Sequence, residues 1–311
     1  MIPAGQIAAQ RSSPLPRLIK NTPMPLLIYR IYSSLPALTA LIALTTALVG
    51  CQGTPKVAPA LQQQAYSDAP YARVLAASVR DGLVDYPAIG LSSADGADAL
   101  DVQLNIYLDA IARFGPESTP EQFPTRADRF AYHLNAYNAI MLRRWLNAGA
   151  QDAKPTDKVG VLTWFTLDRW TLDGRKTTLN DLEQKLIRPV YDDYRAHAAL
   201  VCGAIACPPL RDEPFRGPQL DAQLDDQMVQ WLNNPEEQGI ALNADGTVTL
   251  ATIFKWYRED FSSTGGLYAA VDKHLDNAIP RKPAMLEAIG QDRIVFPTYD
   301  WSINLAPAAA P

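Results

Sequence analysis

The stretch RFAYHLNAYNAIMLRRWL, residues 129–146, decides how the chain builds its core. On an α-helix at about 100° per residue, its large apolar side chains gather within one arc of about 120°. We therefore expect a helix from about Arg126 to Asn147 that packs against the rest of the domain by this face. The side chains of the face are Phe130, Leu134, Met141, Leu142 and Trp145.

Two asparagines lie on the same apolar face, Asn138 in its middle and Asn135 at its edge. A buried amide without partners costs about 1–3 kcal/mol, so Asn138 must be hydrogen-bonded to something specific. Two interpretations are open: the amide clamps a neighbouring backbone loop, or it orients a catalytic histidine or donates to an oxyanion. His133 lies on the opposite side of the helix and is expected to face solvent.

The stretch RAHAALVCGAIACPPLRDEPF, residues 195–215, places His197 near Cys202 and Cys207. We expect its AHAALV part to be a buried strand, because it is short, apolar and bounded by turns. On a straight strand the odd separation puts His197 and Cys202 on opposite faces. Activation of a thiol by the histidine then needs a turn, which Gly203 favours. The same turn can bring the two cysteines within disulfide distance.

Three interpretations of the cysteines therefore remain open. They form a structural disulfide or part of an inert core, or one of them is a nucleophilic thiolate activated by His197 or a helix N-terminus. The third is thiol–disulfide exchange, although four residues separate the cysteines rather than two. Zinc lacks a fourth ligand at a familiar spacing, and the sequence has neither a G-x-S-x-G elbow nor a phosphate-binding glycine loop. We predict no metal and no cofactor.

The N-terminus has the pattern of a secretory signal. Residues 1–50 contain four basic residues and no acidic one, and a mostly apolar run extends from Leu35 to Val49. This run is too short to span a membrane comfortably. It ends in LVGC, residues 48–51, which resembles the bacterial lipoprotein cleavage box. We therefore predict a lipoprotein signal peptide over residues 1–50 and lipidation of Cys51.

Lipidation predicts a location and a redox environment. The mature chain is then held at a membrane by the lipid on Cys51. Gln52, in place of an aspartate, favours the periplasmic face of the outer membrane in a bacterial cell envelope. That compartment is oxidising, so a disulfide between the two remaining cysteines, Cys202 and Cys207, is the starting expectation.

The predicted mature chain is acidic. Without the four basic residues of the signal, 24 of the 28 Lys and Arg residues remain against 33 Asp and Glu, a net charge of −9. This argues against nucleic acid as a partner. The expected partner is the membrane, through the lipid anchor at Cys51, and the sequence identifies no substrate or protein partner. We expect a flexible tether over residues 51–68, one globular domain over 69–305 and a disordered tail over 306–311.

The secondary-structure signals are mixed. Helical spacing comes early in the chain, at residues 71–84 and 99–114. Hairpin signals come later, at 165–179, which contains an Asp-Gly turn, and at 240–250. Strands and helices do not alternate regularly. The pattern therefore predicts a single α+β domain, with an N-terminal helical part and antiparallel hairpins, rather than a doubly wound sheet.

Five ordered blocks resemble the family catalogued as domain of unknown function 547, which occurs in bacterial envelope proteins and in plant and animal relatives. The resemblance covers roughly residues 70–305. The blocks are YHLNAYNAI (132–140), TLNDLEQKLIRP (178–189), HAALVCGAIACPPLR (197–211), IFKWYREDF (253–261) and YDWSIN (299–304). The family's characteristic residues correspond here to Asn135, Tyr137, Asn138, Glu183, His197, Cys202, Cys207, Pro208 and Trp301.

The resemblance implies roles for some of these residues. Plant relatives keep the first cysteine and often lack the second, which makes Cys202 the better nucleophile candidate. By analogy with papain-like and transglutaminase-like folds, Cys202 attacks, His197 is the base, and Asn135 or Asn138 orients the ring. The expected function is then a cysteine-dependent hydrolase or acyltransferase acting on peptide or amide bonds. The alternative is a non-catalytic envelope binding or assembly module with a Cys202–Cys207 disulfide. Three further residues are expected to be structural or to line a pocket: Glu183, Tyr137 and Trp301.

Overall fold

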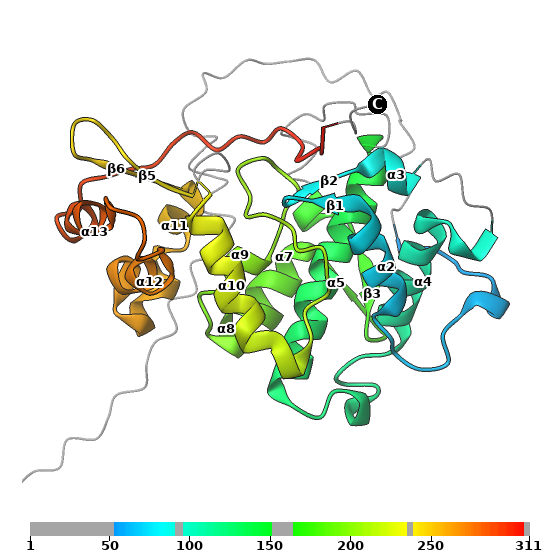
Figure 1. The fold of residues 1–311 in the computed structure, drawn as a ribbon. Coiled ribbons are helices and arrows are strands. Elements are labelled where there is room, and N and C mark those ends of the chain that lie inside the picture. The colour runs from blue at the N-terminus through cyan, green and yellow to red at the C-terminus, as the bar shows by residue number, and fades with distance from the viewer. Residues whose placement is uncertain (1–52, 91–95, 151–163, 235–238, 308–311) are drawn as a thin grey trace, which may run out of the picture. The chain divides into compact units, whose positions relative to one another are not determined.

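The expected helix is present as α5 (Arg126–Asn147), which buries the apolar face predicted for it. A capping box opens the helix: the Thr125 hydroxyl accepts from the Asp128 N–H, and the Asp128 carboxylate accepts from the Thr125 N–H. Helix α4 (Leu100–Arg113) and the segment Leu182–Ile187 pack against α5. These elements lie beside α5 in Figure 1.

The computed structural model describes residues 53–90, 96–150, 164–234 and 239–307. They belong to one compact unit of helices and small, mainly antiparallel sheets, so the predicted α+β class is confirmed. The predicted signal peptide and Cys51 lie outside the described residues. Within the described ranges, no helix combines the length and apolarity that a membrane crossing requires.

Helices dominate the N-terminal part, but the first one ends earlier than its sequence pattern indicated. Helix α2 (Ala69–Ser78) gives way to a hairpin, because Asp81 and Gly82 adopt positive φ angles of 51° and 83°. In this hairpin β1 (Val79–Arg80) pairs with β2 (Leu83–Val84). The other elements of this part are η1 (Pro59–Leu61), α3 (Tyr86–Gly90), η2 (Gly96–Asp98), α4 and η3 (Pro120–Gln122).

The first predicted hairpin is present as β3 (Trp170–Leu172) paired with β4 (Arg175–Thr177). Its turn residues, Asp173 and Gly174, have φ angles of 49° and 73°, as a type I′ turn requires. The helical segment that follows begins at Thr178, whose hydroxyl accepts from the Asp181 N–H. It continues through α7 (Leu179–Asp181), the π-helix η5 (Leu182–Ile187) and α8 (Arg188–Tyr191).

The prediction of a strand at AHAALV, residues 196–201, is wrong. These residues form the short helix α9 (Ala196–Ala199), and the chain becomes extended only at Leu200. A short apolar run fits a buried strand or a buried helix equally well, and alanine, the strongest helix former, supplies three of the four residues in α9. Helix α10 (Leu220–Leu232) follows the 3-10 helix η6 (Gly217–Gln219).

The second predicted hairpin is present as β5 (Ile240–Leu242) paired with β6 (Val248–Leu250). Strand β7 (Ile294–Val295) joins it parallel to β6. Beyond β7 the chain leaves this sheet, pairs at Ile303 with the loop near Cys202, and reaches the β1–β2 hairpin at Leu305 (Figure 1). The remaining elements are α11 (Thr252–Trp256), η8 (Arg258–Thr264), α12 (Gly266–His274) and α13 (Lys282–Gly290).

The described parts of the predicted tether and tail lie against the domain. The Thr54 hydroxyl accepts from the Thr171 N–H at 2.9 Å, and the Tyr66 ring lies 4.8 Å from that of Phe123. At the other end, the Ala306 N–H donates to the Val84 carbonyl at 2.9 Å. Thr54 and Tyr66, which lie within the predicted tether, therefore contact the domain.

Candidate functional site

Cys202 and Cys207 form a disulfide, with their Cα atoms 6.2 Å apart. The turn expected at Gly203 is present, with a φ angle of 79°. The Cys202 N–H donates to the Cys207 sulfur at 2.9 Å, and the Tyr299 hydroxyl lies 3.1 Å from each sulfur. All three side chains are buried. Neither sulfur is a free thiol in this structure.

The Asn138 amide holds the backbone that leads into the disulfide. Its nitrogen donates to the Ala199 carbonyl at 2.9 Å, and its oxygen accepts from the Val201 N–H at 3.0 Å. About two turns further along α5, the Trp145 indole N–H donates to the Cys202 carbonyl at 2.8 Å. Two side chains of one helix therefore fix the chain from α9 to the first cysteine.

Asn135 makes the same kind of clamp at a different place. Its amide nitrogen donates to the Phe215 carbonyl at 2.8 Å, and its oxygen accepts from the Phe215 N–H at 2.9 Å. This contact lies beyond the second cysteine in the chain. Both conspicuous asparagines of α5 therefore satisfy their amides on backbone groups of the stretch 195–215, on either side of the disulfide.

His197 is buried, and it hydrogen-bonds to a carboxylate. Its Nε2 lies 2.7 Å from Oδ2 of Asp260, and its ring stacks on Tyr257 with centroids 4.1 Å apart. Asp260 also receives Nε and Nη2 of Arg188, at 2.7 and 2.8 Å. Burial alone would raise the pKa of the Asp260 carboxyl, but the hydrogen bond from His197 and the pairing with Arg188 hold it well below its usual range. The Nε2 of His197 is thus committed to Asp260.

A second carboxylate, Glu183, lies in the π-helix η5 and is buried. It accepts from the Tyr257 hydroxyl at 2.6 Å, from the Gln184 amide at 3.0 Å and, more weakly, from the Tyr137 hydroxyl at 3.5 Å. Burial, and then the charge of Glu183, raises the pKa of both tyrosines well above 10, so both hydroxyls stay protonated donors. Tyr257 therefore links Glu183 to the His197 ring that stacks on it, and π-helical turns often mark functional positions.

Trp301 lies in an aromatic group beside the disulfide. Its ring is half-buried and lies 4.6 Å from Tyr299, whose hydroxyl contacts both sulfurs, and 6.4 Å from Trp256. Trp256 in turn lies 4.8 Å from Tyr299. The C-terminal segment therefore brings Tyr299 and Trp301 to the cysteines, and the pairing of this segment with the disulfide loop fixes their position.

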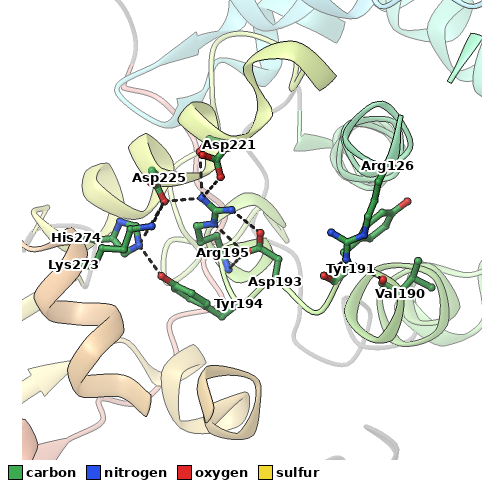
Figure 2. A network of polar contacts seen from close by, with 10 residues as sticks. All are labelled: Arg126, Val190, Tyr191, Asp193, Tyr194, Arg195, Asp221, Asp225, Lys273 and His274. Carbon is green, nitrogen blue, oxygen red and sulfur yellow. Dashed lines mark hydrogen bonds and ion pairs between the residues drawn. The ribbon is translucent and has the colours of Figure 1, made fainter. Parts of the chain in front are cut away.

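The residues just before His197 tie α9 to two other helices (Figure 2). The Arg195 guanidinium pairs with three carboxylates, one from its own loop and two from α10. These are Asp193 and Asp221, each at 2.8 Å, and Asp225 at 2.7 Å. Lys273 of α12 also pairs with Asp225, at 2.9 Å. This network positions the start of α9, and hence His197, from outside the core.

His133 is half-buried rather than solvent-facing. Its Nδ1 lies 2.8 Å from the Tyr191 hydroxyl at the end of α8, and burial lowers the pKa of the imidazole to about 4. The opposite side of α5 is covered by α8, which the helical spacing of α5 alone does not reveal. His133 thus packs between α5 and α8.

Asp260, Arg188 and Tyr257 are the site residues that the sequence did not point to. Asp260 and Tyr257 stand in the block IFKWYREDF, but they are more than 50 residues from His197 and Glu183 along the chain. No local spacing relates such distant positions. The sequence signal for Asp260 and Tyr257 is the composition of that block, in which acidic and aromatic residues are neighbours. Over the described residues, no group of three or more His, Cys, Asp or Glu side chains is placed to hold a metal ion.

Residues 120–232 match the model of a family described as "Protein of unknown function, DUF547". The matched range contains α5, Glu183 and the disulfide loop, and it supports the resemblance drawn from the sequence. No curated protein matches the chain. No solved structure matches it either.

Proposed function

We propose that this protein is a lipid-anchored component of the bacterial envelope whose domain is a non-catalytic binding or assembly module. The signal-like N-terminus and the cleavage-box motif at Cys51 support the anchor and the periplasmic face of the outer membrane. The bond between Cys202 and Cys207 is the observation that favours a non-catalytic module, because cysteine-dependent catalysis would need a free thiol and both thiols are oxidised in the disulfide.

The disulfide loop has a structural role that suits such a module. The Ile205 N–H donates to the Ser302 carbonyl at 2.7 Å, and the Asn304 N–H donates to the Gly203 carbonyl at 3.0 Å. These bonds hold the C-terminal segment, which runs from β7 to the β1–β2 hairpin. The loop therefore fixes the segment that carries Trp301, a half-buried aromatic side chain that we propose contacts a partner.

A count of free thiols tests the proposal. Alkylation and mass spectrometry on the purified full chain, before and after reduction, should find Cys202 and Cys207 unreactive at first and both reactive afterwards. Fatty-acid labelling should be lost in Cys51→Ser, which should also leave the membrane fraction. Free thiols at both positions before reduction would contradict the module, and labelling that persists in Cys51→Ser would contradict the anchor.

A second function, cysteine-dependent acyl chemistry on a peptide or amide, has one observation in its favour. His197 is held by Asp260 as a general-base histidine is held by a carboxylate in catalytic triads. This acyl chemistry requires a reduced Cys202 within hydrogen-bonding reach of His197. Rapid alkylation of Cys202 well below about pH 8 in protein that was never reduced would favour this function over the module.

A further inference from the structure

We propose that the Cys202–Cys207 disulfide exchanges with a dithiol, with the Cys202 sulfur as the atom attacked and the Cys207 sulfur as the leaving thiolate. This activity goes beyond the structural role of the disulfide in the proposed module, and it does not depend on the lipid anchor.

The hydrogen bonds to the two sulfurs are unequal. Cys207 receives the Cys202 N–H at 2.9 Å and lies 3.1 Å from the Tyr299 hydroxyl. Among the residues that the structure describes, the Cys202 sulfur has a single hydrogen-bond partner, the Tyr299 hydroxyl, also at 3.1 Å. Donors stabilise a thiolate far more than a neutral sulfur, so the negative charge released by breaking the bond is better held on Cys207. A sulfur whose thiol has the lower pKa is also the faster leaving group.

Both cysteines are buried, and Cys207 is the more deeply buried residue: Cys202 is 8% exposed, and Cys207 is 4% exposed. The difference agrees with attack at Cys202.

The fold around the loop does not depend on the disulfide alone. The crosslink joins residues only five apart in sequence, so it removes little freedom from the unfolded chain. Asn138 and Trp145 hold one side of the loop, and the Ala204–Ile303 bridge holds the other. The loop can therefore keep its position when the bond is broken, which a reversible exchange requires.

Burial, together with two nearby carboxylates, keeps the Tyr299 hydroxyl a donor. Burial first, and then the carboxylates of Glu183 and Asp300, raise the pKa of its hydroxyl far above its ordinary value of 10. The hydroxyl is thus protonated at every pH at which the cysteines titrate, and it can donate to the Cys207 thiolate when that charge appears.

The exchange balances in two steps. A thiolate of the dithiol bonds to the Cys202 sulfur, the Cys202–Cys207 bond breaks, and its electron pair goes to Cys207. The second thiol of the partner, deprotonated, then attacks the partner's own sulfur in this mixed disulfide and releases Cys202 as a thiolate. The partner is oxidised to a disulfide, and this protein gains two electrons and the two protons that the partner gives up.

Dithiothreitol is the probe for the rate test, used on the full chain in its folded state and in urea. Peptide mass spectrometry follows Cys202 and Cys207 separately from Cys51. We expect the folded protein to be reduced at least as fast as the unfolded chain. A folded disulfide protected by tenfold or more would overturn the proposal, since roughly that factor corresponds to a barrier higher by about 1.4 kcal/mol.

Alkylation of the reduced protein with iodoacetamide at a series of pH values tests the assignment of the two sulfurs. The midpoint for Cys207 should lie about one pH unit or more below that for Cys202, whose ordinary thiol pKa is about 8.5. Tyr299→Phe should raise the Cys207 midpoint and slow reduction by about threefold. Tyr268→Phe, on an exposed tyrosine of α12, is the matched control and should change neither.

Three results would overturn the proposal even if Tyr299→Phe does not fold. They are equal midpoints for the two cysteines in the unmutated protein, a lower midpoint for Cys202, and loss of the far-ultraviolet circular dichroism of the fold on reduction. The thiol count in the proposed function is separate, because an exchangeable disulfide and an inert one both protect the thiols before reduction.

Discussion

The Nε2 atom of His197 lies 2.7 Å from Oδ2 of Asp260, although the two residues are 63 positions apart in sequence. The contact joins α9 to the 3-10 helix η8, and Arg188 completes it by holding both oxygens of Asp260. One carboxylate thus fixes three segments that approach the core from different parts of the chain. Its removal is the most direct test of what this cluster contributes.

Asp260→Asn keeps the shape of the side chain and removes its charge. We expect the free energy of unfolding at pH 7 to fall by about 1–3 kcal/mol, the usual range for a partly buried, charge-assisted hydrogen bond. Urea unfolding measures it. Asp98→Asn is the matched control, because Asp98 pairs with Arg73 at 3.7 Å with its side chain 85% exposed. That change should stay within about 0.5 kcal/mol.

The same variant has an expected pH dependence. The pKa of Asp260 is held below its usual range in the folded protein, so its stabilising effect is complete above the unfolded pKa of about 3.9. That effect is lost as the pH falls from there toward the folded pKa. The difference between the wild type and Asp260→Asn should therefore shrink below about pH 4. A difference that grows on acidification would contradict the role assigned to Asp260.

The parts of the fold that the sequence predicted are those fixed by local patterns. Helix α5 follows from its 3.6-residue apolar spacing. The β3–β4 hairpin follows from the Asp173-Gly174 pair, because few other residues accept two consecutive positive φ angles. The prediction for the AHAALV segment failed because its period is ambiguous over so few residues. In the fold, the pairing of Arg195 with α10 adds to the helix propensity of the alanines in α9.

The candidate site was predicted where its residues carry a local signal in the sequence. Gly203 between the cysteines indicated a turn, and the disulfide is there. The buried amide of Asn138 predicted a specific partner, and its partners are backbone groups of residues 199 and 201. Asp260 could not be found in this way, because the approach of η8 to α9 depends on tertiary packing, which leaves no periodic trace in the sequence.

We predict that the folded protein loses stability in mild acid because of His274. It is buried against Tyr194, whose hydroxyl lies 2.9 Å from its Nε2, and burial lowers the pKa of the imidazole to about 4. Between the unfolded pKa of about 6.5 and the folded value, the unfolded chain binds more protons, so stability falls as the pH falls. The slope is at most about 1.4 kcal/mol per pH unit for one group.

His274→Gln should remove this part of the slope. Urea unfolding at pH 7, 6 and 5 gives the slope for each protein. His133 has a pKa shifted in the same direction, so part of the slope should persist in the variant and disappear only when His133 is also replaced by Gln. An unchanged slope in His274→Gln would mean that the imidazole is not held neutral in the folded protein.

Asn138→Ala should destabilise the fold strongly. The substitution leaves the Ala199 carbonyl and the Val201 N–H buried without their partner, which costs about 2–4 kcal/mol for the two groups together. Asn105→Ala is the control on α4, since that amide makes one long hydrogen bond of 3.4 Å to Asp101. We expect less than about 1 kcal/mol there by denaturant unfolding. Equal losses at the two positions would mean that the clamp adds nothing.

Gly203→Ala separates backbone strain from a side-chain clash at the disulfide turn. A Cβ atom at Gly203 would overlap the Trp145 indole, whereas one at Gly174, also at positive φ, would meet nothing within 4 Å. Gly174→Ala should therefore cost only the left-handed backbone penalty, about 1–2 kcal/mol. Gly203→Ala should cost a further 1–3 kcal/mol or so, about the penalty for overpacking a core.

The displaced indole would also lose its hydrogen bond to the Cys202 carbonyl, and a shift in tryptophan fluorescence reports this in the folded protein. Equal losses of stability with unchanged fluorescence would mean that Trp145 does not press on the turn.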